Sequence, residues 1–414
     1  MHRIDGPNVE ADKFGSGKDG FTEGTPGSVL PTEVTDDWLD GVQEELCNVI
    51  ENADITLVKN TRDQLHDALN IMINRANLLG RWPSIYNPKA FGLHAIMYDS
   101  YSGYWFAVGA LDGTDAYMLR SLSPGGDWTE MSNSKNANLY GIASNGAGTL
   151  AAVGSFDGVD TYIVSSTNNG DTWTERTGPN AALLWGLVYA NSLFVGVGEL
   201  SGAPAISTSS DGTTWTARTA PGTERLYAIA YSPTLNLFCA VGEDGTDLGI
   251  MTSPDGITWT ERANSIGGAD AWSLCWSEFL GLFILVGYDT GTYPLVATSP
   301  DGITWTQRTD ANGLLDTSHL YSVCSIESAK LLIAFGQEGN EENSLDAYFS
   351  TDGITWTFRP IVGTDPTTGC MYQMKDVAED QDTGLVIACG ERPSGSGQAT
   401  LMRPAATNLA VEDI

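Results

Sequence analysis

Seven ring-bearing side chains recur in the second part of the chain, each near the start of an apolar segment that predicts a β-strand. They are His94, Tyr140, Trp185, Tyr227, Trp272, Tyr321 and Tyr372. If these strands surround a common axis, the rings form a circle at one end of a channel, where they could stack on the faces of sugars. The alternative is that each ring packs between neighbouring repeats. The pattern predicts a receptor-binding site for a glycan.

Acidic residues cluster in the loops that follow a second set of predicted strands. The binding candidates are Asp112, Asp115, Asp157, Asp160, Asp244 and Asp247. In a propeller these loops open at the same end as the connections between blades, so we expect them to surround the rings. They could bind Ca²⁺ through carboxylate and carbonyl oxygens or attract cationic receptor groups. Alternatively, they are solvated turn residues; no cofactor and no metal ligand set are predicted.

Catalytic signals in the sequence are weak. The four histidines (His2, His66, His94 and His319) are scattered, and neither G-x-S-x-G nor H-E-x-x-H occurs. Glycoside hydrolysis needs only two carboxylates at a suitable separation, and 52 acidic residues cannot be sorted by spacing alone. We therefore predict no catalytic residues and no enzyme, with a glycoside hydrolase as the alternative.

A repeated hairpin must position these side chains. Its plainest copies are SPDGITWTER at 253–262, SPDGITWTQR at 299–308 and STDGITWTFR at 350–359. Asp-Gly suits a tight turn because the aspartate bonds its own backbone and glycine tolerates positive φ. The tryptophan that follows can bury about 150–250 Å². We expect a structural role for Asp211, Trp215, Asp255, Trp259, Asp301, Trp305, Asp352 and Trp356.

The spacing of the repeats predicts a mainly β fold, a seven-bladed β-propeller over 81–414. Successive repeat tryptophans from Trp128 to Trp356 lie 42 to 51 residues apart, which is the length of a propeller blade. Apolar strands that end in glycine, from Gly109 to Gly390, occur seven times. The last unit lacks a tryptophan hairpin, so we expect the strand around Trp82 to complete it and remove an open sheet edge.

Residues 1–80 follow a different pattern, which predicts an extended arm and two helices. The first 30 residues are rich in Gly and Pro without hydrophobic period, so order there requires a partner. Thr35 precedes an apolar stripe from Trp38 to Ile50, and a second helix fits about 61–78. Two short amphipathic helices need to pack on each other, on symmetry mates or on another protein.

Charge narrows the classes of partner. The 414 residues carry 20 Lys and Arg against 52 Asp and Glu, a formal net charge of −32. Such a surface repels nucleic-acid phosphates and anionic membranes. No run of about 18 apolar residues could span a bilayer. We expect neither nucleic-acid binding nor membrane insertion.

The hairpin signature resembles the Asp-box, or bacterial-neuraminidase, repeat over roughly 81–404. Four copies place glycine directly after aspartate, whereas the usual spacing leaves one residue between them, as at 168–170. The resemblance implies a propeller, but that family includes sialidases, other glycosidases, sorting receptors and binding proteins. A sialidase would imply an arginine triad, yet the arginines that follow the tryptophans, such as Arg176 and Arg218, are explained by the repeat itself.

The opening residues MHRIDGP, followed by FTEGTPGSVLPTEVTDDWLDGVQEEL from residue 21, resemble the N-terminal segment of tail fibre and related tail proteins of tailed bacteriophages and prophages. The resemblance implies a virion protein, assembled in the host cytoplasm, that contacts other tail proteins through residues 1–80. Fibres are usually trimers, so a homo-oligomer is expected. The predicted function is host-surface recognition, of a glycan, by a tail fibre or appendage protein. The alternatives are a virion-associated, sialidase-like glycosidase and a purely structural tail or decoration protein.

Overall fold

The computed structural model describes residues 36–404, except 60, 80–81, 83, 86–90, 114, 124–126, 134, 136, 244–247, 265, 290–293, 309–317, 339–344, 362–372 and 392–398. The chain divides into two compact units, Met1–Arg75 and Ala76–Ile414. The described part is mainly β with a small helical segment, which confirms the predicted fold class. Neither described helix is long and apolar enough to cross a membrane.

The two predicted helices are α1 (Asp36–Asn52) and α2 (Gln64–Leu78). A small apolar cluster joins them, formed by Ile50, Ala53, Ala68 and Ile71. Arg75 adds an ion pair to Asp54 at 2.7 Å. Other apolar side chains of both helices stay exposed: Leu39, Leu46, Leu69, Met72 and Ile73. The described residues thus leave these side chains uncovered.

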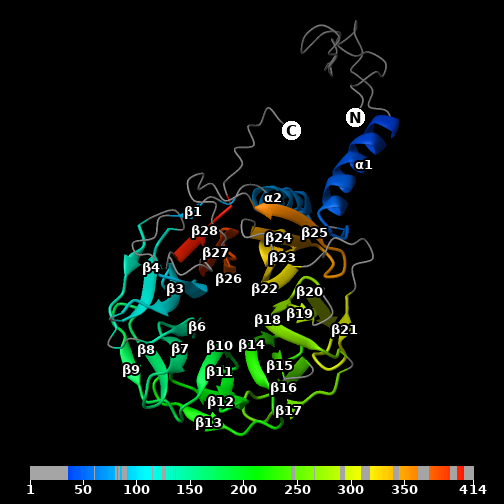
Figure 1. Ribbon diagram of the computed structural model, residues 1–414. Coiled ribbons are helices and arrows are strands. Elements are labelled where there is room, and N and C mark those ends of the chain that lie inside the picture. Colours follow the sequence, from blue (N-terminus) through cyan, green and yellow to red (C-terminus); the bar gives the residue numbers. More distant parts are fainter. Residues whose placement is uncertain are drawn as a thin grey trace, which may run out of the picture. The chain divides into compact units, whose positions relative to one another are not determined.

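Seven four-stranded antiparallel sheets surround a central channel in the described residues (Figure 1). Blade 1 contains β2 (Leu93–Asp99), β3 (Tyr104–Leu111), β4 (Ala116–Ser121) and β5 (Thr129–Glu130). Blade 2 contains β6 (Leu139–Ser144), β7 (Leu150–Phe156), β8 (Thr161–Ser166) and β9 (Thr174–Arg176). Blade 3 contains β10 (Leu183–Ala190), β11 (Leu193–Leu200), β12 (Ala203–Ser209) and β13 (Thr216–Arg218).

The remaining blades repeat this order, with the first strand of each nearest the channel (Figure 1). Blade 4 contains β14 (Arg225–Ser232), β15 (Leu237–Glu243), β16 (Leu248–Ser253) and β17 (Thr260–Glu261). Blade 5 contains β18 (Ala269–Ser277), β19 (Leu282–Asp289), β20 (Pro294–Ser299) and β21 (Thr306–Gln307). Blade 6 contains β22 (Ser318–Ile326), β23 (Leu331–Glu338), β24 (Leu345–Ser350) and β25 (Thr357–Ile361).

Blade 7 joins the two ends of the propeller. Its strands are β26 (Gln373–Asp380), β27 (Leu385–Glu391), β28 (Ala399–Met402) and, from before blade 1, β1 (Ser84–Ile85). Ser84 pairs with Met402. Trp82 itself is 1% exposed, and its ring lies nearly perpendicular to that of Phe335 with the ring centroids 5.5 Å apart. The sheet is therefore closed by a strand that begins two residues after Trp82.

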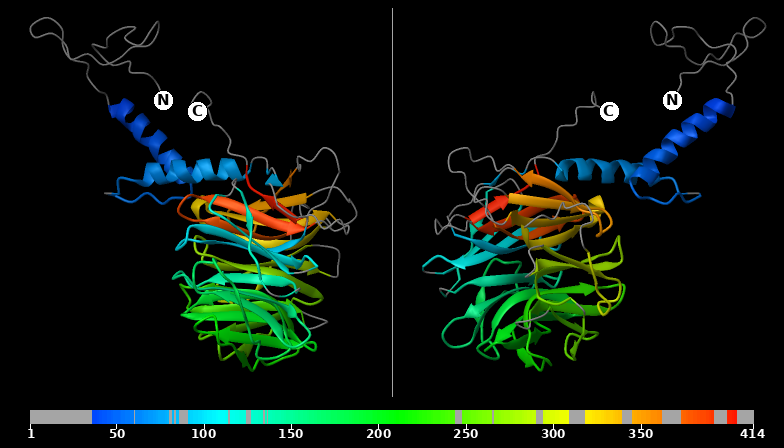
Figure 2. Two further views of the ribbon diagram at one scale, coloured as in Figure 1. Left: turned by 90° about the vertical axis from the view of Figure 1, so that its left-hand side faces the viewer. Right: turned by 45° about the vertical axis from the view of Figure 1, so that its right-hand side comes forward.

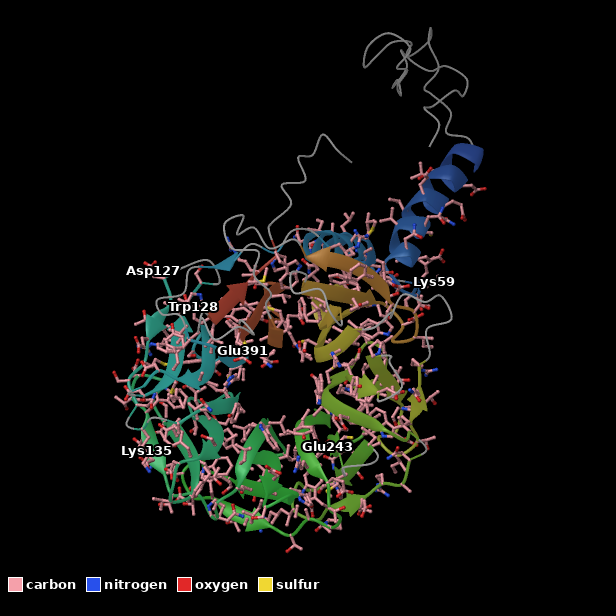
Figure 3. All side chains as sticks on the ribbon, in the orientation of Figure 1. Lys59, Asp127, Trp128, Lys135, Glu243 and Glu391 are labelled. Atoms are coloured by element: carbon pink, nitrogen blue, oxygen red, sulfur yellow. The ribbon has the colours of Figure 1, made fainter. Side chains whose placement is uncertain are left out.

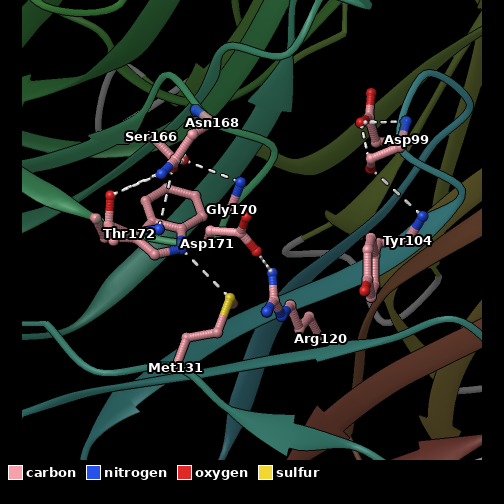
Figure 4. Close-up of polar contacts among 11 residues, drawn as sticks. Asp99, Tyr104, Arg120, Met131, Ser166, Asn168, Gly170, Asp171 and Thr172 are labelled. Atoms are coloured by element: carbon pink, nitrogen blue, oxygen red, sulfur yellow. Dashed lines mark hydrogen bonds and ion pairs between the residues drawn. The ribbon is translucent and has the colours of Figure 1, made fainter.

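Side-chain hydrogen bonds hold the Asp-Gly turns. The Asp255 Oδ1 atom accepts the backbone N–H groups of Ile257 and Thr258 at 2.8 and 2.7 Å. The Ser253 hydroxyl accepts the Gly256 N–H at 2.9 Å, and Trp259 is 6% exposed. Asp211, Asp301 and Asp352 accept the same pair of backbone bonds. Figure 4 shows the variant with Asn168 in blade 2.

Chain direction gives the two ends of the channel different turns. The first strand of each blade runs from the end that holds the predicted rings, the mouth end, to the opposite end, the hairpin end. The hairpin end therefore carries the turns between the first and second strands and the Asp-Gly turns between the third and fourth. The mouth end carries the loops between the second and third strands and the connections between blades. Figure 2 shows the blades from the side.

Candidate binding site at the mouth of the propeller

A β-bulge occurs at the same place in the first strand of every described blade. Pairing with the second strand skips one residue, for example between Leu226 and Ala228 in β14. A bulge re-aims the side chain that it skips. The skipped residues are His94, Tyr140, Trp185, Tyr227, Trp272, Tyr321 and Lys375.

In blades 1 to 6 a glycine of the second strand lies against the bulged strand. A Cβ atom on Gly242 would lie 1.7 Å from the carbonyl oxygen of Arg225. The corresponding contact is 2.5 Å or less at Gly109, Gly154, Gly198, Gly287 and Gly336. The glycines that mark the repeat in the sequence thus allow the backbone of the bulged strand to approach closely.

The bulged residues line one cavity of about 680 Å³, which we call the mouth cavity. Its lining residues are His94, Ala110, Asn138, Tyr140, Trp185, Tyr227, Trp272, Tyr321, Lys375 and Glu391. Six of the seven predicted ring residues therefore meet here, each of them half-buried. Tyr372 lies outside the described residues, and Lys375 holds the bulged position of blade 7.

The six rings pair across neighbouring blades. His94 and Tyr140 stack with ring centroids 4.9 Å apart. Trp185 meets Tyr227 edge to face at 4.9 Å. Trp272 and Tyr321 stack at 5.3 Å with an angle of 11° between their planes. The rings thus pack between neighbouring blades, which is one of the two alternatives from the sequence, and they also border the cavity.

In blade 7 the bulged residue, Lys375, forms an ion pair instead of a ring pair. Lys375 Nζ lies 3.2 Å from Glu391 Oε1 and 5.2 Å from the centre of the Tyr321 ring. Glu391 Oε2 lies 3.7 Å from His94 Nε2. The His94 ring beside this carboxylate, together with the charge of Lys375, lowers the pKa of Glu391 to about 2. Glu391 is therefore an ionised carboxylate beside the cavity (Figure 3).

A second charged group lies next to Tyr227. The Tyr227 hydroxyl donates to Glu243 at 2.6 Å, and Arg225 bonds both Glu243 and Glu199, at 3.2 and 2.9 Å. Burial and the nearby Glu243 carboxylate raise the pKa of Asp270 to about 6. The Glu243 and Asp270 carboxylates therefore lie close enough to repel each other.

Aspartates in the predicted acidic loops accept hydrogen bonds from the backbone of their own loop. Asp112 Oδ1 accepts the N–H of Asp115 at 2.8 Å. Asp157 accepts the N–H groups of Val159 and Asp160 and pairs with Lys135 at 2.5 Å. None of the described residues Asp112, Asp115, Asp157 and Asp160 lines the mouth cavity. Asp244 and Asp247 lie outside the described residues. The described part of the chain holds no cluster of three potential metal ligands.

The repeat arginines serve their own blades. The Nε atom of Arg218 donates to the Thr208 hydroxyl at 2.8 Å, across the two outer strands of blade 3. Arg176, Arg262 and Arg308 make the same contact in their blades. The Arg120 side chain pairs with Asp171 of the next blade at 2.7 Å (Figure 4). These contacts leave the described repeat arginines outside the mouth cavity.

The mouth cavity also has lining residues that the sequence patterns did not single out, among them the charged Lys375 and Glu391. Their signal is positional. In blade 6, Leu320 pairs with Gly336 and is followed by the bulged Tyr321; in blade 7, Met374 pairs with Gly390 and is followed by Lys375. The bulged residue is therefore the one that follows the apolar partner of the repeat glycine. This rule identifies Lys375, whereas a search for ring side chains does not.

Comparison with known sequences gives one strong, partial match. The chain is 46% identical over 82 residues to the uncharacterized protein StfP of Escherichia coli strain K12. The match covers 19% of this chain and 39% of StfP, so it spans well under half of either protein. No protein-family model matches the chain.

Solved propellers share the fold at low sequence identity. YCF48 bound to a D1 peptide has a TM-score of 0.57 at 14% identity, covering 78% of this chain and 97% of that chain. The GH74 enzyme of Niastella koreensis has a TM-score of 0.56 at 17% identity, covering 74% and 52%. U3-55K has a TM-score of 0.56 at 9% identity, covering 78% and 98%. These likenesses support the propeller fold.

Proposed function

We propose that this chain is a bacteriophage tail fibre or appendage protein. It attaches to other virion tail proteins through residues 1–80 and recognises a host-surface glycan through the mouth cavity. The N-terminal resemblance supports attachment to a tail. The exposed apolar side chains of α1 and α2, such as Leu39 and Met72, support a protein partner or a second copy for this segment.

The observation that carries the recognition role is the composition of the mouth cavity. Half-buried rings from six blades border about 680 Å³, within the roughly 300–1,000 Å³ that is typical of ligand sites. Asn138, Lys375 and Glu391 add donors and an acceptor to the same cavity. Ring faces with a few polar groups at their edge are suited to a sugar, which has an apolar face and hydroxyls around its rim.

Cell labelling by the full chain tests this function. Fluorescent protein is added to cells of the strain that the parent phage infects, and the same protein competes with virions for adsorption. We expect saturable labelling that falls at least about tenfold in Trp272→Ala, because one aromatic platform is lost. Ile257→Ala, in an exposed Asp-box turn at the hairpin end, is the control and should label like the parent.

Three outcomes separate the candidate functions. Equal labelling by Trp272→Ala and the parent would contradict the mouth as the site. Virions without the chain that adsorb normally would contradict the receptor role and favour a purely structural one. Release of reducing sugar from host capsule or lipopolysaccharide, abolished by Glu391→Gln, would favour the glycosidase.

A further inference from the structure

The lining of the mouth cavity has two chemically different sectors. Blades 3 to 6 contribute four rings, including Trp185 and Trp272. Blades 7, 1 and 2 contribute the polar groups, including Asn138, Lys375 and Glu391. A ligand that fills the cavity therefore contacts rings along one side and hydrogen-bonding groups along the other.

The charged groups of the polar sector already neutralise each other. Lys375 and Glu391 form an ion pair at 3.2 Å, with side chains that remain 27% and 33% exposed. A carbonyl oxygen can only accept, so the 3.0 Å contact between His94 Nδ1 and Leu139 O places a hydrogen on Nδ1. Nε2 of that ring then faces Glu391. The cavity thus offers donors and a carboxylate acceptor, with the charges of Lys375 and Glu391 balancing each other.

The surroundings of the ring sector are acidic. Glu199 and Glu243 share the single Arg225 beside Tyr227, and Asp270 lies against Glu243. The whole chain has a formal net charge of −32. An anionic ligand would meet this field and would also compete with Glu391 for Lys375.

We propose that the mouth cavity binds an uncharged, hydroxyl-rich sugar residue and discriminates against sugars that carry a carboxylate. The sugar ring stacks on the aromatic sector, and its hydroxyls bond Glu391 and Lys375 together. A hydroxyl both donates and accepts, so it bridges the two partners without breaking their ion pair. This inference rests on the proposed glycan recognition and adds the chemical class of the ligand.

An array of bacterial-surface oligosaccharides tests the inference with the full chain. The oligosaccharides are printed in matched sets that share one ring and differ in charge: a neutral hexose, its hexuronic acid and its free 2-amino sugar. We expect the parent protein to prefer a neutral member over its uronic acid by at least about tenfold. Trp272→Ala should weaken binding to every member that the parent binds.

Two mouth variants should move the preference in opposite directions. Glu391→Gln keeps the shape of the side chain and leaves an excess positive charge, so binding of the uronic acid should rise about tenfold relative to the neutral sugar. Lys375→Gln leaves an excess negative charge and should raise binding of the amino sugar instead. Glu278→Gln and Lys330→Gln make the same charge changes in turns at the hairpin end and should leave the preference unchanged.

The outcomes separate this inference from the proposed function. A parent protein that prefers uronic acids, or a Glu391→Gln variant with unchanged preference, overturns the charge assignment while glycan recognition stands. Binding to no oligosaccharide, together with absent cell labelling, overturns both. A neutral preference that the two mouth variants shift as described supports the inference.

Discussion

The two ends of the channel are made from the same repeat, yet their polar side chains are used differently. At the hairpin end, carboxylates bond the backbone of the preceding blade: Glu327 accepts the N–H of Glu278 at 3.0 Å, and Glu379 accepts the N–H of Glu327 at 2.8 Å. At the mouth end, Lys375 and Glu391 bond each other beside a cavity. Both ends join neighbouring blades, and at the mouth end the side chains that do so also face a cavity that a ligand can fill.

This difference shows how a repeat separates stability from recognition. Turn chemistry at the hairpin end is local and recurs with nearly the same contacts in blade after blade. The bulged position at the mouth end is supported by backbone and glycine, so its side chain is free to vary. His94, Trp185 and Lys375 occupy equivalent places with different chemistry.

The largest expected effect contrasts tryptophans from the two ends. Trp259→Ala removes a side chain that is 6% exposed and should lower the free energy of unfolding by about 3–5 kcal/mol. Trp272→Ala removes a half-buried mouth ring and should cost about 1–2 kcal/mol, with loss of cell labelling. Chemical denaturation of both variants measures this. Equal destabilisation would contradict the division between the ends.

The next effect tests the backbone support of the mouth. Gly242→Ala places a Cβ atom 1.7 Å from the Arg225 carbonyl oxygen, which should cost about 3 kcal/mol and disturb the adjacent Tyr227. Gly41→Ala is the control, because no atom lies within 4 Å of its added Cβ and α1 favours alanine. A Gly242→Ala protein with unchanged melting temperature and labelling would show that the bulge does not need glycine.

A third effect concerns pH and the closure between blades 7 and 1. Asp376 Oδ2 accepts the Ile96 N–H at 3.0 Å, as the Ser273 hydroxyl accepts the Val323 N–H between blades 5 and 6. Burial raises the pKa of Asp376 to about 7. Between about pH 4 and 7 the unfolded chain loses this proton while the folded chain keeps it, so stability should fall as pH rises and then level off.

Asp376→Ser tests this dependence of stability on pH. It introduces serine, the residue that blade 5 has at the equivalent position, Ser273. It should retain the bond between blades, raise the free energy of unfolding at pH 8 by about 2 kcal/mol and flatten its dependence between pH 4 and 7. Thermal unfolding across this range provides the measurement. If the free energy of unfolding of the variant depends on pH as steeply as that of the parent, groups other than Asp376 cause the dependence.

The smallest expected effect concerns Asp255 at the hairpin end, whose contribution to stability increases with pH, whereas that of Asp376 decreases. Backbone hydrogen bonds, first that of Thr258, lower the pKa of Asp255 to about 2. Its stabilisation is complete above the ordinary aspartate pKa and is lost as pH falls through about 2. Asp255→Ala should cost about 1 kcal/mol at pH 7 and less at pH 2. Asp382→Ala, also exposed, is the control; an equal loss in both variants would contradict the turn role.

Much of the fold was predictable because its signals are local. The Asp-Gly turns, the buried tryptophans and the glycine-ended strands each need only neighbouring residues, so their period indicated the number of blades. Ser84 and Ile85 could be placed by counting from Trp82. The acidic loops were harder to assign. A sequence cannot distinguish an aspartate that bonds its own turn, as Asp157 does, from one that faces a ligand.

The amino-acid sequence by itself determined the repeat, the residues of its turns and the ring side chains that recur with it, because each follows from short-range chemistry. Only the tertiary structure decided which side chains meet in the mouth cavity. Which side chains line the cavity depends on where the bulges lie in the first strands. Because the number of blades is odd, six bulged rings form three pairs, and the bulged residue of blade 7 is Lys375. Contacts between residues hundreds of positions apart, such as Glu391 with His94, exist only once the ring closes.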